Sequence, residues 1–195
     1  MPLAPFSAFA FKWSGRTDHI ITSVELTEAF DLSRPPTPIP ARVQATALWD
    51  TGATGSCITP AVADPLRLPQ TGLRLVYHGG GTGHAKTYLA NIYLPNGVAI
   101  AGVELAETPN TPQFGVIIGM NVITLGDFAV TNAGGQTWAS FRCPSIEGID
   151  YVAEANRIHF AGVNRNDPCP CGKRDANGKP VKFKKCHGAT DASAR

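Results

Sequence analysis

Charged residues are scarce in this chain of 195 residues, where Asp, Glu, Lys and Arg make up 16% of the sequence, against about 25% in an average soluble protein. No apolar run approaches the roughly 18 residues that cross a membrane. The apolar start, residues 1–11, has no basic residue before it and lacks the charged region of a secretory signal. Five cysteines are an odd number and make a poor disulfide framework. We therefore expect a cytoplasmic protein with reduced thiols and no membrane span.

Glycine and proline are abundant instead, with 20 and 16 residues, and they separate short apolar segments. Segments rich in β-branched or alternating apolar residues predict strands. The predicted strands cover residues 20–26, 41–49, 73–77, 87–94, 98–105, 116–119, 127–131 and 136–141. A short helix is predicted from Pro60, with Thr59 as its N-cap, and a longer helix over 146–158. Strands at this spacing favour an all-β barrel or sandwich.

An aspartate in a glycine-containing turn follows the strand predicted at 41–49. The run Asp50-Thr51-Gly52-Ala53 has two interpretations. In the simpler one, the Asp50 side chain accepts hydrogen bonds from its own turn, and Gly52 supplies an unusual backbone conformation. In the other, the end of a rigid strand presents a catalytic carboxylate.

The surrounding sequence favours the catalytic interpretation. Residues 47–54, Ala-Leu-Trp-Asp-Thr-Gly-Ala-Thr, resemble the active-site loop of retropepsin-like aspartic proteases. Residues 116–124, Val-Ile-Ile-Gly-Met-Asn-Val-Ile-Thr, resemble the family's second signature, which leads into a short helix. Between them, residues 78–88 occupy the place of the family's glycine-rich flap, and 78–84 predict a flexible loop. Three features in this order, over about residues 20–141, are far more specific than one short motif.

The resemblance implies an aspartic endopeptidase with an all-β fold, a closed retropepsin-type barrel with a Gly-rich flap and one C-terminal helix. Peptide hydrolysis by carboxylates needs a pair that shares one proton, because two like charges about 3 Å apart cannot both ionise. This chain has one Asp-Thr-Gly-Ala run and is too short for a two-lobed enzyme. A homodimer with one Asp50 from each copy at its two-fold axis would complete the pair, and catalysis would need no cofactor.

The resemblance also assigns roles around Asp50, the catalytic carboxylate. Thr51 is expected to bond across the dimer axis, and Gly52 to let the backbone approach the carboxylates. The residues expected to contact substrate are Ala53, Gly79, Gly80, Gly81, Gly83 and Ile118. The chain departs from the family at Met120, where viral members have an arginine that braces the dimer, and at Thr54-Gly55, where an acidic residue is common.

A second group of chemically active residues lies near the C-terminus. Cys169, Cys171, Cys186 and His187 supply three thiolates and one imidazole, a complete tetrahedral ligand set for structural zinc. A segment of about thirty residues cannot form a core of its own, so bound Zn²⁺ would supply its folding free energy. The alternative is a disordered basic tail with unconnected cysteines. We expect the other two cysteines to be buried thiols, and these are Cys57 and Cys143.

The tail resembles the SEC-C motif, the small zinc module of the bacterial preprotein translocase motor. The resemblance lies in residues 166–173, Asn-Asp-Pro-Cys-Pro-Cys-Gly-Lys, and 183–188, Phe-Lys-Lys-Cys-His-Gly, with a turn-like insertion between them. Residues 165–195 carry eight Lys or Arg and three Asp or Glu, a net charge of +5, whereas residues 1–164 carry nine and twelve, a net charge of −3. This basic tail suggests docking to an acidic protein, to ribosomal RNA or to anionic lipid headgroups.

We therefore expect three parts in the chain. Residues 1–145 form a retropepsin-like protease domain with its core at about 20–141, residues 146–164 form a helix and linker, and residues 165–195 form the zinc module. The leading hypothesis is a homodimeric endopeptidase of peptide or protein substrates, whose zinc module recruits a substrate or partner. The competing hypothesis is a non-catalytic dimerisation domain that presents two zinc modules as a bivalent adaptor.

Overall fold

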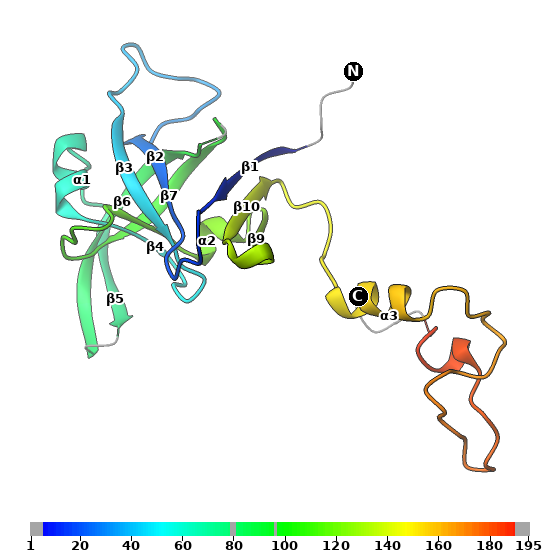
Figure 1. Cartoon of the computed structure of the whole chain (residues 1–195). Coiled ribbons are helices and arrows are strands. Elements are labelled where there is room, and N and C mark those ends of the chain that lie inside the picture. The colour runs from blue at the N-terminus through cyan, green and yellow to red at the C-terminus, as the bar shows by residue number, and fades with distance from the viewer. Residues whose placement is uncertain (1–5, 79–80, 96, 190–195) are drawn as a thin grey trace, which may run out of the picture. The chain divides into compact units, whose positions relative to one another are not determined.

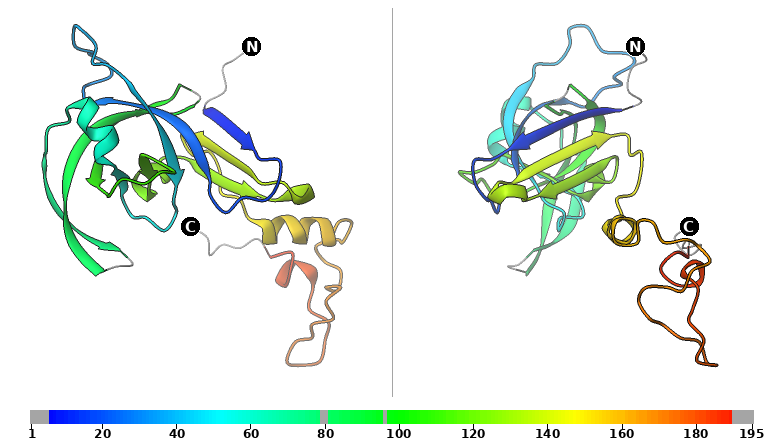
Figure 2. Two further views of the ribbon diagram at one scale, coloured as in Figure 1. Left: turned by 60° about the vertical axis from the view of Figure 1, so that its left-hand side comes forward. Right: turned by 45° about the vertical axis from the view of Figure 1, so that its right-hand side comes forward.

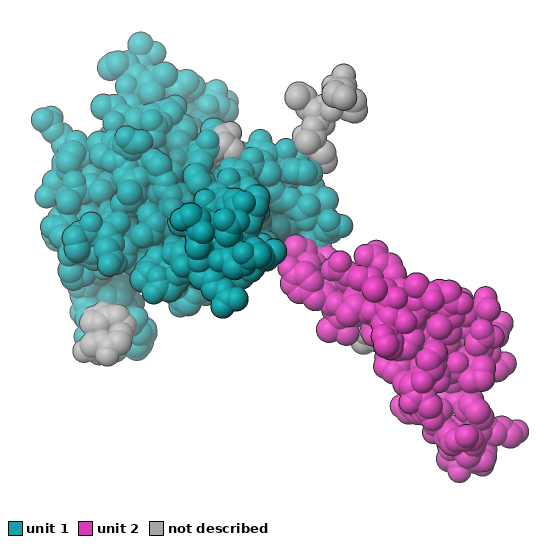
Figure 3. Space-filling model, in the orientation of Figure 1, with its two compact units in different colours: residues 1–147 teal, residues 148–195 magenta. Residues whose placement is uncertain are grey.

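The computed structural model of the chain describes residues 6–78, 81–95 and 97–189. The chain divides into two compact units, residues 1–147 and residues 148–195 (Figure 3). The first unit contains two β-sheets and two short α-helices, and the second contains one α-helix and a largely irregular segment. Within the described ranges, no helix has the length and apolar character needed to cross a membrane.

Seven strands form the larger sheet, in the order β2-β3-β8-β4-β7-β6-β5 (Figure 1). β2 also pairs with β6, which closes six of these strands into a barrel and leaves β5 outside the ring. The strands are β2 (Ile21–Glu28), β3 (Val43–Trp49), β4 (Ser56–Ile58), β5 (Gly72–His78), β6 (Gly81–Tyr93), β7 (Ala99–Glu107) and β8 (Val116–Ile118). The prediction of an all-β protein with a closed barrel is confirmed.

The barrel closes mainly around branched apolar side chains, and β3 contributes Ala47 and Trp49 instead. Alternation along β2 shows how the sequence directs them inward, since Val24 and Leu26 are buried, Ser23 is exposed and Glu25 is half-buried. The side chains with no exposed surface include Leu26, Ile58, Ile92, Leu105, Val116 and Ile118. Helix α1 (Pro60–Leu66) begins after Thr59 with proline in its first turn, as predicted.

A smaller antiparallel sheet has the order β1-β10-β9. It joins the two ends of the first unit, because β1 (Ser7–Lys12) pairs with β10 (Trp138–Cys143), which also pairs with β9 (Asp127–Thr131). Figure 2 shows β1, in blue, running along the yellow-green β10. No element was predicted before residue 19, because the run Ser-Ala-Phe-Ala-Phe-Lys is short and one third of it is alanine. Its pairing with the distant strand β10 stabilises it.

The β5–β6 hairpin corrects the prediction of a flexible loop at residues 78–84. His78 ends β5 and pairs with Gly81, and residues 81–84 are the first part of β6. Gly81 has a φ of 124°, a conformation that glycine adopts without strain. Cross-strand pairing therefore extends the strands beyond what the glycine content suggested. Gly79 and Gly80, which were expected to contact substrate, lie outside the described residues.

The second unit begins with helix α3 (Tyr151–His159). Its N-cap is Asp150, whose carboxylate accepts hydrogen bonds from the backbone N–H groups of Val152 and Ala153 (2.8 and 2.9 Å). The helix starts five residues later than the predicted residue 146, because this cap fixes its first turn. The remainder of the unit is irregular apart from one 3₁₀ turn, Phe183–Lys185.

Asp127, the first residue of β9, holds the chain segment that leaves β10. Its carboxylate accepts hydrogen bonds from Arg142 Nε (2.5 Å), Ser145 Oγ (2.5 Å) and the backbone N–H of Ile146 (3.0 Å). The hydrogen bond from Ser145, with those from Ile146 and Arg142, holds the pKa of Asp127 well below its usual value. The ionised form is therefore the one that stabilises this corner of the small sheet.

We expect Asp127→Asn to remove an acid-sensitive contribution to stability. A carboxylate whose pKa is lower in the folded state than in the unfolded state, where it is about 3.9, stabilises the fold above that pH and loses its contribution as the pH falls below it. Between about pH 5 and pH 2, the melting temperature of the wild type should fall more steeply than that of the variant. Glu28→Gln, at an exposed position on β2, is the control. Parallel slopes for wild type and Asp127→Asn would contradict this account.

Candidate active site and candidate zinc centre

Asp50 begins the turn that connects β3 to β4. Strand β8 lies between these two strands, because it pairs in parallel with β3 and antiparallel with β4. The backbone N–H of Asp50 donates to the carbonyl oxygen of Ile118, the last residue of β8 (3.0 Å). The two signatures that stand far apart in the sequence, around Asp50 and around Gly119, therefore meet in the fold.

The turn itself is held by short-range hydrogen bonds. Asp50 Oδ1 accepts from the backbone N–H of Gly52 (2.8 Å), and the carbonyl oxygen of Asp50 accepts from Ala53 N–H (3.2 Å). Asp50 is half-buried, whereas Thr51 and Gly52 are exposed. The Asx-type contact of the simpler interpretation is thus present, but it uses one lone pair of a carboxylate that has about four. The carboxylate therefore keeps further lone pairs that can accept hydrogen bonds.

Gly119 allows the end of β8 to lie directly on this turn. A Cβ atom at Gly119 would lie 2.5 Å from the carbonyl oxygen of Gly55 and 2.9 Å from that of Ala53, closer than side chains pack. The next residue, Met120, donates its backbone N–H to the carbonyl oxygen of Ala53 (2.8 Å). The glycine in the apolar-apolar-Gly signature is therefore required by close backbone contact with the Asp50 turn.

Two polar side chains that sequence reasoning missed brace the same contact. Ser56 Oγ accepts from the backbone N–H of Gly119 (3.0 Å) and donates to Asn121 Oδ1 (2.7 Å). Asn121 Nδ2 in turn donates to the carbonyl oxygen of Glu104 on β7 (3.3 Å). Asn121 lies in helix α2 (Met120–Ile123), the short helix that the second signature predicts. The position of Asn121 within the second signature was the one sequence feature that could have indicated its role. No sequence feature indicated the role of Ser56.

One residue expected to contact substrate is part of the core instead. Ile118 has no exposed surface, because β8 is flanked by β3 and β4 and directs this side chain into the barrel. Its carbonyl oxygen, not its side chain, serves the Asp50 turn. The prediction of a substrate contact through Ile118 is therefore corrected. Gly81 and Gly83 lie on β6, in the hairpin that extends beyond the barrel in Figure 1.

The cysteines of the first unit are less buried than expected. Cys57 and Cys143 are both half-buried, so the prediction of two buried thiols is wrong. Cys57 lies on the three-residue strand β4, and its side chain is near enough to Asp50 for the two groups to interact electrostatically. Burial raises the pKa of the Cys57 thiol, the Asp50 charge raises it further, and Arg74 opposes both.

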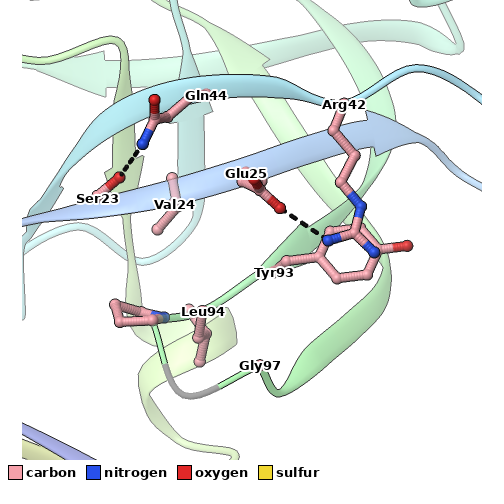
Figure 4. Close-up of a pocket in the computed structure, with 9 residues that line it drawn as sticks. Ser23, Val24, Glu25, Arg42, Gln44, Tyr93, Leu94 and Gly97 are labelled. Atoms are coloured by element: carbon pink, nitrogen blue, oxygen red, sulfur yellow. Dashed lines mark hydrogen bonds and ion pairs between the residues drawn. The ribbon is translucent and has the colours of Figure 1, made fainter.

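A hollow of about 490 Å³ lies at the other end of β3 (Figure 4). The Arg42 guanidinium bonds to Glu25 (2.7 Å) and lies over the Tyr93 ring, 3.8 Å from its centre. Gln44, which also lines the hollow, precedes Asp50 by six residues, about 20 Å along an extended strand. The hollow is therefore separate from Asp50, and its charges are already paired with one another.

The four predicted zinc ligands lie together in the second unit. Their ligand atoms are all within 4.8 Å of one another. Cys169 Sγ and Cys186 Sγ lie 3.3 and 3.4 Å from His187 Nδ1, and Cys171 Sγ lies 3.6 Å from Cys186 Sγ. With usual Zn–S and Zn–N bond lengths, the ligand atoms of a tetrahedral site are roughly 3.5–3.8 Å apart. The cluster therefore fits an ion of the size of Zn²⁺.

Two tight turns present these ligands. Gly172 N–H bonds to the carbonyl oxygen of Cys169 (3.0 Å), and Cys186 N–H bonds to that of Phe183 (2.9 Å). Burial alone would raise the pKa of the Cys169 thiol, but hydrogen bonds from Cys171 and His187 lower it to about 6. Burial and the two neighbouring sulfur atoms raise the pKa of Cys186. Three thiolates this close repel one another, and a bound cation would remove that conflict.

Helix α3 is tied to the same cluster by an aromatic contact. Phe160, which follows α3 and is 8% exposed, packs against Phe183 with ring centres 5.2 Å apart. It also packs against the His187 ring, with centres 4.8 Å apart. Since His187 is one of the four clustered residues, Phe160 connects the end of α3 to the candidate metal site.

Comparison with known proteins gives separate results for the two units. No family model matches the chain. Over 31 residues, 16% of this chain, the sequence is 64% identical to the protein translocase subunit SecA of Anaeromyxobacter sp. (strain Fw109-5). The matched segment is 3% of that protein's length, and it carries the SEC-C motif.

Two solved structures are similar in fold. One is a retropepsin-like aspartic protease from Rickettsia conorii, with 11% identity, 73% of this chain and 99% of that chain covered, and a TM-score of 0.45. The other is the Simian Foamy Virus (mac) protease, with 18% identity, 41% and 80% covered, and a TM-score of 0.32. With its closed barrel and its joined signatures, the first unit resembles retropepsin-like aspartic proteases, and the second unit resembles a SEC-C zinc module.

We expect Cys186→Ala to abolish stoichiometric zinc binding and to unfold the second unit, including α3. The metal would supply most of the folding free energy of so small a unit, and Phe160 would lose its contact with a fixed His187 ring. Zinc content and hydrogen exchange of the amides of residues 151–160 test this. Cys143→Ala, in the first unit, is the matched control and should keep the metal. Retained zinc in Cys186→Ala, or unchanged protection of α3, would show that the cluster does not hold the unit together.

Proposed function

We propose that this protein is an aspartic endopeptidase that acts as a homodimer. The observation that carries the proposal is the placement of Asp50, half-buried at the head of a turn whose next residues, Thr51 and Gly52, are exposed. The turn is fixed by β3, β8 and Gly119, so two copies could face each other without rearrangement. Two such carboxylates about 3 Å apart would share one proton.

The chemistry follows from that shared proton. The ionised Asp50 would take a proton from a water molecule as its oxygen attacks the carbonyl carbon of the substrate. The protonated Asp50 of the partner subunit would donate to the carbonyl oxygen. When the C–N bond breaks, the leaving nitrogen takes the proton that Asp50 gained, and the partner's Asp50 regains one from a hydroxyl group of the intermediate, so that the pair returns to its starting state. The backbone N–H of Gly52, 2.8 Å from Asp50 Oδ1, would orient the carboxylate, and Thr51 would bond across the axis.

The substrate would be an extended segment of a peptide or protein, held between this turn and the β5–β6 hairpin. Ala53 would border it on one side, with Gly81 and Gly83 of the hairpin on the other. Substrate contacts of Gly79 and Gly80, which lie outside the described residues, stay a prediction from the sequence. Apolar residues at alternate positions of β5 are exposed and would offer it an apolar surface, and these are Leu73, Leu75 and Tyr77.

The zinc module would be a structural and docking element. Four protein ligands, Cys169, Cys171, Cys186 and His187, leave no open position for a reacting water. Its basic side chains would bring a substrate or partner to the protease, whether an acidic protein, ribosomal RNA or an anionic lipid surface. These side chains are Lys173, Arg174, Lys179, Lys182, Lys184 and Lys185. Reduced thiols in this set agree with a cytoplasmic location.

We expect the wild type to cleave unfolded casein within about pH 4–7, and Asp50→Asn to lose this activity by at least about 10³-fold. The amide cannot take the proton from water, and the substitution removes both members of the pair. Fragment release measured by gel electrophoresis across the pH range tests this. Asp64→Asn, in α1, is the matched control and should cleave at the wild-type rate.

The competing hypothesis, a bivalent adaptor, predicts a different result in the same samples. If neither protein cleaves casein at any pH, and wild type and Asp50→Asn capture partners equally, the adaptor hypothesis replaces the protease hypothesis. Equal cleavage by both proteins would exclude Asp50 as the catalytic group.

A further inference from the structure

The residue before Asp50 connects the active-site turn to the small sheet. Trp49 is the last residue of β3, and 5% of its surface is exposed. One phenylalanine from each strand of the small sheet contacts its indole. The ring centres lie 5.8 Å away for Phe9 on β1, 5.0 Å for Phe141 on β10 and 5.2 Å for Phe128 on β9.

These three phenylalanines form a single row across the small sheet. Phe9 is directly opposite Phe141, and Phe141 is directly opposite Phe128, in the antiparallel registers of the three strands. The Phe128 ring stacks on the indole with an angle of 10° between the planes. Because a one-residue slip in a strand turns every side chain to the other face, the register of the small sheet determines where the indole can lie.

A hydrogen bond from the indole nitrogen of Trp49 fixes the orientation of the ring. Its Nε1 donates to Thr22 Oγ1 on β2 (2.9 Å), and Thr22 is 4% exposed. The backbone N–H of Trp49 donates to the carbonyl oxygen of Ile20 (2.9 Å). A buried hydrogen bond and three aromatic contacts therefore fix the ring of Trp49, and a second hydrogen bond fixes its backbone.

We propose that Trp49 is a positioning residue, which sets the direction in which Asp50 presents its carboxylate to a partner subunit. This inference rests on the proposed protease function. A displacement of a reacting group by about 1 Å can lower a rate by about 10²-fold, and the groups that support a site determine its precision. Trp49 acts on the reaction only through Asp50.

The titration of Asp50 measures this positioning without requiring turnover. Two carboxylates that share a proton titrate in two steps, and the separation of the steps increases as the carboxylates approach each other. Within one protomer, the Cys57 thiol is the ionisable side chain shown to interact with Asp50, and Arg74 faces that thiol. Neither residue is changed in the test below, so a change in the separation would report a change in the Asp50 pair.

The test compares wild type with Trp49→Phe, which keeps an aromatic ring and loses the indole N–H. Carboxyl carbons are followed by NMR in protein labelled with ¹³C-aspartate, and Asp50→Asn identifies the Asp50 signal. We expect two steps about 3 pH units apart in the wild type, as in other aspartic dyads, and steps at least about 1 unit closer in Trp49→Phe. On casein, kcat should fall about tenfold with KM within about twofold.

Thr22→Val removes the hydrogen-bond acceptor and keeps the shape of the side chain, so it should bring the steps closer to a smaller degree. If Trp49→Phe does not fold, Thr22→Val alone tests the proposal. Ile92→Ala, at a fully buried position of β6, is the stability control, with a lower melting temperature and an unchanged separation. Unchanged separation in both Trp49→Phe and Thr22→Val would overturn the positioning role and leave the protease proposal standing. A single Asp50 step in the wild type would overturn the protease proposal, and the positioning role with it.

Discussion

The backbone contact between Gly119 and the Asp50 turn is the constraint on which the first unit depends. A carbonyl oxygen 2.5 Å from the site of a Cβ atom leaves room for no residue but glycine. This contact places β8 between the two strands that the turn connects. Ser56 and Asn121 then satisfy the polar groups around it. The turn is fixed by the barrel, and Asp50 remains within reach of a second molecule.

In the proposed function, both units need something from outside the protomer to balance groups of like charge. Three sulfur atoms and one imidazole in contact favour a bound cation, because only a cation makes several adjacent thiolates stable. Two Asp50 carboxylates would instead share a proton. In each case the fold would supply the geometry, and the metal or the shared proton would supply the balance of charge.

The sequence predicted the parts of the molecule that local patterns determine. The all-β class, the start of α1 after Thr59 and the strand before Asp50 follow from alternation, capping and turn residues, and the closed barrel follows from the resemblance to retropepsin-like proteases. Contacts between distant segments could not be predicted, because no local pattern encodes them. They include the pairing of β1 with β10, the roles of Ser56 and Asn121, the aromatic contacts of Trp49 and the burial of Ile118.

The central claim is that one active site needs an Asp50 from each of two copies. Wild type and Asp50→Asn can be unfolded together, refolded at different ratios and assayed on casein at constant total protein. If subunits combine at random, activity should follow the square of the wild-type fraction, about one quarter at equal amounts, because only wild-type pairs have both carboxylates. A linear dependence, about one half at equal amounts, would show that each protomer acts alone and would contradict the account.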